Sequence, residues 1–175
     1  ELIPNPEKLN LLRLKVTGIS LDPQLYINSP ISIQNNILTI KKENSEELKK
    51  KTYILPYTGD NLKNYLGPDQ WVKSDYKPLK ETGFIYARAR KNDAFLFAGY
   101  LNSYLYTLVR TNPMFVLSDS VNILKSLSGD YLERTVMFAS YSRAGGLPTR
   151  LVGGLVYRNG YFYFHTWPEV WFGKW

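Results

Sequence analysis

Asp130, Tyr131 and Glu133 open a predicted helix, and their spacing suggests the start of an active site. Asp130 followed three residues later by Glu133 is a variant of the capping box, in which each side chain satisfies a backbone N–H group of the other residue. Position 131 is then the first helical residue, where the helix dipole and unpaired N–H groups favour negative charge. A thiol there would ionise readily, and an oxyanion would find donors. The residue present is a tyrosine.

His165 is the single histidine of the chain and the second candidate for chemistry. It falls in a predicted strand, where alternate residues point to the same face. The residues that share its face are Tyr161, Tyr163, Trp167, Glu169 and Trp171. A lone histidine in a strand is more often structural than catalytic, but aromatic neighbours are also compatible with a carbohydrate- or partner-binding surface. Pro168 indicates an edge strand or a bulge just beyond the histidine.

The elements that must position these residues follow from local signals. The helix begun at Asp130 is expected to end at Gly145 or Gly146, with Pro148 preventing its continuation. Two β runs follow, and Asn159-Gly160 between them is a strong hairpin signal. The helix start should therefore face His165 across a cleft, with the Tyr131 side chain within several ångströms of the imidazole.

Earlier segments have helical periodicity. Helices are predicted over 79–90, 93–109 and 118–129. The second should carry an apolar stripe that belongs to the core, formed by Phe95, Ala98, Leu101, Leu105 and Leu108. The third is expected to be capped by Ser118 or Asp119 and to stop at Gly129.

The first third of the chain has the pattern of short antiparallel strands. Alternation predicts strands at 11–18, 29–33, 35–42 and 51–59, which would form a small sheet. The charged run 41–51 mixes lysines with glutamates and is interpreted as a solvated loop or hairpin tip. A Pro- and Gly-punctuated stretch at 67–78 marks a boundary. We expect a β-rich module over 1–66 and a second domain over 67–175.

Composition excludes several classes of function. The 175-residue chain has a net charge of +7, no cysteine and one histidine, so disulfides, thiolate metal sites and His-rich metal sites are excluded, and no metal or cofactor is expected. No apolar stretch approaches the ~20 residues of a membrane span. Nucleic acid is disfavoured because the lysine-rich run is not one-signed and the tyrosines are dispersed. A chain without cysteine suits the cytoplasm and an exported location equally.

The order of these parts resembles the transglutaminase-like superfamily, whose core is papain-like. Bacterial members typically read Gly-Asp-Cys-x-Glu-His, an apolar helix, Arg-Ala-x-Gly-(Ile/Leu)-Pro-(Ala/Thr)-Arg, a strand, and then His-x-Trp-x-Glu-Val and Gly-x-Trp. The matching residues here are Gly129, Asp130, Glu133, Arg143, Ala144, Gly146, Leu147, Pro148, Arg150, His165, Trp167, Glu169, Val170, Gly173 and Trp175. The resemblance implies an α+β fold, a transglutaminase-like core of helices packed on an antiparallel sheet, after the small β module.

The resemblance also implies roles for single residues. In the family a cysteine attacks an amide or ester carbonyl, a histidine moves the proton and an aspartate orients the histidine. His165 matches the base, Tyr131 stands at the nucleophile position and Arg134 stands where a histidine is usual. Asp130, Glu133, Trp167 and Glu169 would support the cleft. The chain starts at Glu1 without Met, and the orienting aspartate is expected beyond Trp175, so a longer protein with a truncated core is expected here.

Three functions remain open at this point. The first is a catalytically degenerate domain that acts as a scaffold or binds protein or peptide segments in the cleft that corresponds to the family's active site. The second is a cysteine-type acyltransferase or peptidase acting on protein amide bonds, with its cysteine substituted in this copy. The third is a basic, aromatic-rich glycan or nucleic-acid binder, which requires lysines and tyrosines to cluster on one face.

Overall fold

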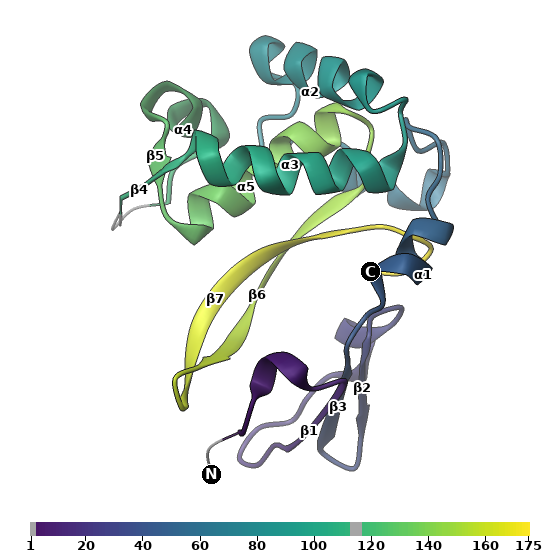
Figure 1. Ribbon diagram of the computed structural model, residues 1–175, viewed down its shortest axis with the longest axis vertical. Coiled ribbons are helices and arrows are strands. Elements are labelled where there is room, and N and C mark those ends of the chain that lie inside the picture. Colours follow the sequence, from purple (N-terminus) through teal and green to yellow (C-terminus); the bar gives the residue numbers. More distant parts are fainter. Residues whose placement is uncertain (1–2, 113–116) are drawn as a thin grey trace.

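The fold combines a helical layer with two separate groups of antiparallel strands. The computed structural model describes residues 3–112 and 117–175. The helices between residues 77 and 144 pack together at one end. A long hairpin of β6 (Thr149–Arg158) and β7 (Tyr161–Val170) sweeps away from them, and a three-stranded sheet lies at the other end (Figure 1). The predicted α+β fold class is confirmed.

Helix α5 lies at the centre of the helical layer. It packs against α2, α3 and α4 and against both strands of the hairpin, and most of its side chains are buried, polar ones included. Thr135 and Ser140 satisfy their hydroxyls by donating to backbone carbonyls one turn earlier in the same helix. The four helices are α2 (Lys77–Ala89), α3 (Ala94–Leu108), α4 (Ser120–Ser126) and α5 (Tyr131–Ala144).

Two details of the predicted helices need correction. In α3 the fully buried face is formed by Ala94, Phe97, Leu101 and Leu105, so Phe97 takes the central place that the predicted stripe gave to Phe95. Helix α4 is capped by Asp119 as predicted, but it ends at Leu127, which adopts the left-handed conformation with φ of 49°. Gly129 therefore does not stop this helix.

The β6–β7 hairpin follows the sequence signal closely. Strand β6 spans Thr149–Arg158 and strand β7 spans Tyr161–Val170. Both turn residues have positive φ, 51° for Asn159 and 87° for Gly160, which is the geometry that a two-residue hairpin turn of type I′ requires. The register places Gly154 opposite His165.

The small sheet holds three antiparallel strands in the order β1-β3-β2. They are β1 (Leu11–Lys15), β2 (Ile31–Gln34) and β3 (Ile37–Lys41). Leu12 and Leu14 are the half-buried residues of β1, as its alternation predicted. The remaining short elements are 3-10 helices η1 (Pro6–Lys8), η2 (Pro23–Tyr26) and η3 (Asp60–Tyr65), and the parallel pair β4 (Arg110–Thr111) and β5 (Ser128–Gly129).

The charged run after the sheet is helical, which corrects the predicted loop or hairpin tip. Helix α1 spans Ser45–Lys50, and the Asn44 side chain accepts a hydrogen bond from the N–H of Glu46 at its start. Glutamates occupy the first turn and lysines the last, an arrangement that the helix dipole favours. The mixed charges that suggested a solvated loop are thus ordered along a helix.

The predicted strand at 51–59 is wrong, because this segment forms an extended strap across the helical layer. Within it, Leu55 donates to the carbonyl of Asn92 and Tyr57 donates to the carbonyl of Gly146. The Tyr53 hydroxyl donates to the carbonyl of Trp171 at 2.9 Å. Leu55 is 3% exposed and belongs to the same core cluster as the helices. The division into 1–66 and 67–175 stays a prediction.

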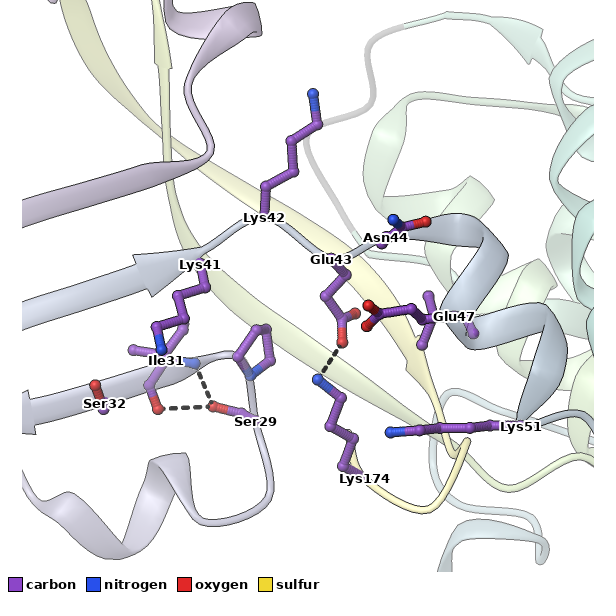
Figure 2. A pocket seen from close by; sticks show the side chains of 12 residues that line it. Ser29, Ile31, Ser32, Lys41, Lys42, Glu43, Asn44, Glu47, Lys51 and Lys174 are labelled. Atoms are coloured by element: carbon purple, nitrogen blue, oxygen red, sulfur yellow. Dashed lines mark hydrogen bonds and ion pairs between the residues drawn. The ribbon is translucent and has the colours of Figure 1, made fainter.

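An ion pair joins the sheet side of the molecule to the end of the hairpin. Glu43, between β3 and α1, lies 2.7 Å from the Lys174 ammonium, beside a cavity of about 430 Å³. Figure 2 shows Lys51 reaching toward Lys174, with Glu47 close to Glu43. The Glu43–Lys174 pair ties the segment after β3 to the segment after β7, which indicates a structural junction.

Arg143, a residue of the family motif, is a second junction. Its side chain is 5% exposed and 2.8 Å from a carboxylate oxygen of Asp69. It also donates to the carbonyls of Thr149 and Gly67 at 2.9 Å. The loop before α2 is therefore fixed to the C-terminal end of α5 through one guanidinium.

Substituting two helical glycines tests how closely α2 approaches α5. A Cβ at Gly83 would lie 2.7 Å from the Cβ of Ala144 and 2.8 Å from the carbonyl oxygen of Tyr141, whereas a Cβ at Gly99 would meet nothing within 4 Å. We expect Gly83→Ala to lower the free energy of unfolding by ~1–3 kcal/mol through overpacking. Gly99→Ala, the matched control, should raise it by ~0.5–1 kcal/mol. Urea denaturation measures both, and equal effects would contradict the close approach.

The stability of the protein should decrease as Asp69 is protonated. Burial raises the pKa of this carboxyl, but the N–H groups of Val72 and Trp71 and the Arg143 guanidinium lower it, with a net shift below its ordinary value of 3.8. A lowered folded pKa stabilises the protein above the ordinary value, and this contribution is lost as pH falls through the folded one. Asp69→Asn should flatten thermal stability against pH below about pH 4. Asp60→Asn, which removes an exposed carboxylate paired with Lys63, is the control, and identical profiles for the two variants would refute this role.

Candidate active-site cleft

The structure brings Tyr131 and His165 together. Tyr131 is the first residue of α5, and His165 lies on β7. Their ring centroids are 4.4 Å apart with an interplanar angle of 34°. The predicted proximity is confirmed, and the catalytic role of either residue stays a prediction.

The start of α5 is fixed by the capping box that the sequence predicted. The N–H of Asp130 donates to Oε2 of Glu133 at 2.8 Å, and Glu133 is 2% exposed. Gly129 makes room for this buried carboxylate, since a Cβ there would lie 2.3 Å from the Cβ of Glu133. Asp130 and Glu133 therefore support the position of Tyr131 by holding the backbone, and they do not line the cleft beside it.

His165 is positioned by the pairing of β7 with β6 and by a contact with α5. The residue opposite is Gly154, whose missing side chain leaves room for the Trp167 ring, because a Cβ there would lie 2.6 Å from its Cη2 atom. The Thr135 hydroxyl of α5 lies 3.2 Å from the carbonyl oxygen of Thr166. The strand residue after His165 is thus attached to the helix that carries Tyr131.

A cleft of about 310 Å³ lies between α3, α5 and β7, and we call it the α3–α5–β7 cleft. Tyr131 and His165 both line it. Its other lining residues are Asn102, Leu105, Tyr106, Arg134, Thr135, Phe138, Thr166, Trp167 and Pro168. Of the three α3 residues, Leu105 was predicted as part of the core, whereas Asn102 and Tyr106 were not singled out from the sequence. They lie four residues apart on the exposed side of α3, a spacing that the sequence does show.

Arg134 occupies one end of this cleft. Its Nη2 atom donates to the carbonyl of Val109 at 2.8 Å and lies 2.7 Å from the Thr111 hydroxyl. The guanidinium carbon lies 5.5 Å from the centre of the Tyr106 ring, within the range of a cation–π contact. Arg134, which the resemblance places where a histidine is usual, is therefore held in a defined position.

Glu169, the other predicted supporting residue, acts at a distance from the cleft. Its carboxylate forms a close ion pair with Arg150, the residue opposite it on β6, at 2.6 Å. The Arg150 guanidinium carbon lies 4.6 Å from the Trp175 ring centre. Nε1 of Trp167 lies 3.4 Å from Oε1 of Glu169. These four family-motif residues form one group that fixes the base of the hairpin, and Trp167 alone among them lines the cleft.

The charges of the cleft are positive. In the described part of the chain no Asp or Glu side chain lines it. Over residues 3–112 and 117–175, no group of three or more His, Cys, Asp or Glu side chains is placed to hold a metal ion. The helices of these same ranges are too short or too polar to cross a membrane.

Comparison with known proteins agrees with this geometry. The family model of the transglutaminase-like superfamily matches residues 86–175, and the chain belongs to this superfamily. A solved structure from Cytophaga hutchinsonii, described as a candidate cysteine protease, is similar with a TM-score of 0.60 at 13% identity. That similarity covers 77% of this chain and 47% of the other, so the chain spans about half the length of that structure. No curated protein matches the chain.

The geometry predicts that a thiol at position 131 would be activated. In Tyr131→Cys the new side chain would lie at the start of α5 beside His165, and we expect its pKa to fall below the ~8.5 of free cysteine. The measurement is the rate of iodoacetamide alkylation against pH. Adding His165→Ala should move the midpoint up, because the imidazolium partner is lost.

The matched control is Ser45→Cys, the first residue of α1, which has a helix start without a histidine. Its alkylation profile should not respond to His165→Ala. A Tyr131→Cys midpoint at or above that of Ser45→Cys, and equally indifferent to His165, would contradict the proposed nucleophile position.

Proposed function

We propose that this transglutaminase-like domain binds protein or peptide segments in the α3–α5–β7 cleft and catalyses no acyl transfer. The observation that supports this most directly is the Tyr131 ring lying against the His165 ring, at a centroid distance of 4.4 Å. The position from which the family nucleophile attacks is filled by an aromatic side chain.

Tyrosine is a poor replacement for the family cysteine. A phenol has an ordinary pKa of ~10 against ~8.5 for a thiol, so it is ionised far less near neutral pH. Its ring also packs over the imidazole face, where a scissile carbonyl would need room. Both effects favour a cleft that still binds a polypeptide but does not catalyse acyl transfer.

The lining of the cleft suits a peptide. Tyr106, Phe138 and Trp167 offer aromatic surface, and Asn102 and Arg134 offer hydrogen-bond donors at its rim. Clefts with apolar walls and a few placed polar groups are typical binding sites. The family assignment and the similarity to a candidate cysteine protease also support a polypeptide as the ligand.

We expect the protein to release no ammonia from glutamine-containing peptides and to incorporate no amine. The physical reason is the absence of a nucleophile that ionises near neutral pH at position 131. An enzyme-coupled ammonia assay over several hours measures the first activity. Time-dependent release that persists through purification and is abolished by His165→Ala would favour the enzyme alternative.

Binding is tested separately with an array of immobilised heptapeptides of random sequence. Trp167→Ala should weaken retention on the array about tenfold or more, as expected for a buried aromatic contact. Phe84→Ala is the matched control, because Phe84 is 58% exposed on α2 and does not line the cleft. Equal retention of the wild type and both variants would place any binding outside the cleft.

A further inference from the structure

We propose that Arg134 makes the α3–α5–β7 cleft selective for peptide segments that carry a carboxylate, so that an acidic residue of the ligand pairs with its guanidinium. This inference rests on the proposed function, since it specifies the ligand of the same cleft. The family motif has a histidine at this position, so the selectivity would belong to this chain.

The contacts of Arg134 leave donors available. Its Nη2 atom is engaged by the Val109 carbonyl and the Thr111 hydroxyl. Nη1 makes no hydrogen bond to a described residue and is the donor left for a ligand, whereas Nε is buried without a partner and is out of a ligand's reach. No carboxylate of the described residues lies within ion-pair distance of Arg134, whereas Arg143 and Arg150 form ion pairs with Asp69 and Glu169. The guanidinium is thus fixed in place but not neutralised.

The surroundings strengthen the preference for an anion. Arg134 is half-buried, so its charge is partly removed from water, and the described lining contains no acidic side chain. The nearest acidic residues along the helix are Asp130 and Glu133. The Glu133 carboxylate accepts a hydrogen bond from the Asp130 N–H away from the cleft. A charged group that is partly desolvated and unpaired gains most from a partner of opposite sign.

Arginine is suited to this task because its planar guanidinium meets a carboxylate with directed, charge-assisted hydrogen bonds. The hydrogen bonds of Nη2 hold the guanidinium, and the exposed Tyr106 ring lies within cation–π range of it at 5.5 Å. Arg134 lies three residues after Tyr131 in α5, so their Cβ atoms are neighbours on the helix surface, ~5–6 Å apart. The acidic residue of the ligand would therefore lie next to the ligand residue that covers the Tyr131–His165 pair.

The test uses two pools of fluorescein-labelled heptapeptides with random flanking residues, one with Glu and one with Gln at the central position. Fluorescence anisotropy at moderate salt measures the affinity of each pool. We expect the wild type to bind the Glu pool about tenfold more tightly. Arg134→Gln should remove this preference while binding of the Gln pool is retained, and Arg134→Lys should keep part of it.

The matched control is Arg88→Gln, which removes the same charge from the exposed surface of α2 and should leave the preference unchanged. Because Arg134→Gln also loses two internal hydrogen bonds, its fold is checked by circular dichroism, and the wild-type preference is measured independently against pH. It should disappear as the ligand glutamate is protonated below its ordinary pKa of ~4.3.

The outcomes separate the two proposals. Equal binding of both pools by the wild type, or a preference that survives Arg134→Gln, rejects the role of Arg134 and leaves peptide binding standing. Failure of both pools to bind rejects the proposed function itself. Stronger binding of tri-galacturonate than of either pool would assign the cleft to acidic glycans and also overturn the peptide proposal.

Discussion

The burial of most of α5 is the constraint on which the rest of the structure depends. Beyond its first turn nearly every residue of the helix is buried, so the polar groups there are costly unless they have partners inside the protein. The Asp130 N–H finds one in the Glu133 carboxylate, Thr135 and Ser140 use the helix's own carbonyls, and Arg143 ties the far end to Asp69 and two carbonyls. These bonds fix both ends of the helix, and its first residue is thereby held against the hairpin.

None of these supports involves the side chain at position 131. The capping box acts through the backbone of Asp130, and the hairpin is attached through Thr135 and Thr166. We therefore expect a substitution at position 131 to cost the scaffold little, because the contacts that hold its backbone do not depend on its side chain. The capping box and the hairpin contact can thus be kept whatever side chain position 131 carries.

Much of the fold was predictable from the sequence where a local signal has one structural meaning. Asn159-Gly160 predicts the two-residue hairpin turn that is observed, and the spacing of Asp130 and Glu133 predicts the start of α5. Helix α1 was missed because its charges were interpreted as a solvated loop, although Asn44 and the acidic first turn form a helix start. Gly129 was misassigned because its role is to leave room for the Glu133 side chain, a tertiary contact without a local pattern. The spacing of Asn102 and Tyr106 is visible in the sequence, but their place in the cleft depends on tertiary contacts such as that of Tyr106 with Arg134 on α5, which have no local pattern.

Residues 52–57, the part of the strap that contacts the helical layer, determine how much of the chain is needed for the helical core to fold by itself. Its backbone is bonded to the turn before α3 and to the end of α5, and the Tyr53 side chain to the end of the hairpin. Its Leu55 side chain is part of the helical core. Bringing together segments from distant parts of the chain costs the entropy of closing the long loops between them, which slows folding. A fragment beginning at the Pro- and Gly-rich stretch near residue 67 would lack the strap. The carbonyls of Asn92, Gly146 and Trp171 would lose their hydrogen-bond donors, and the helical core would lose the Leu55 side chain.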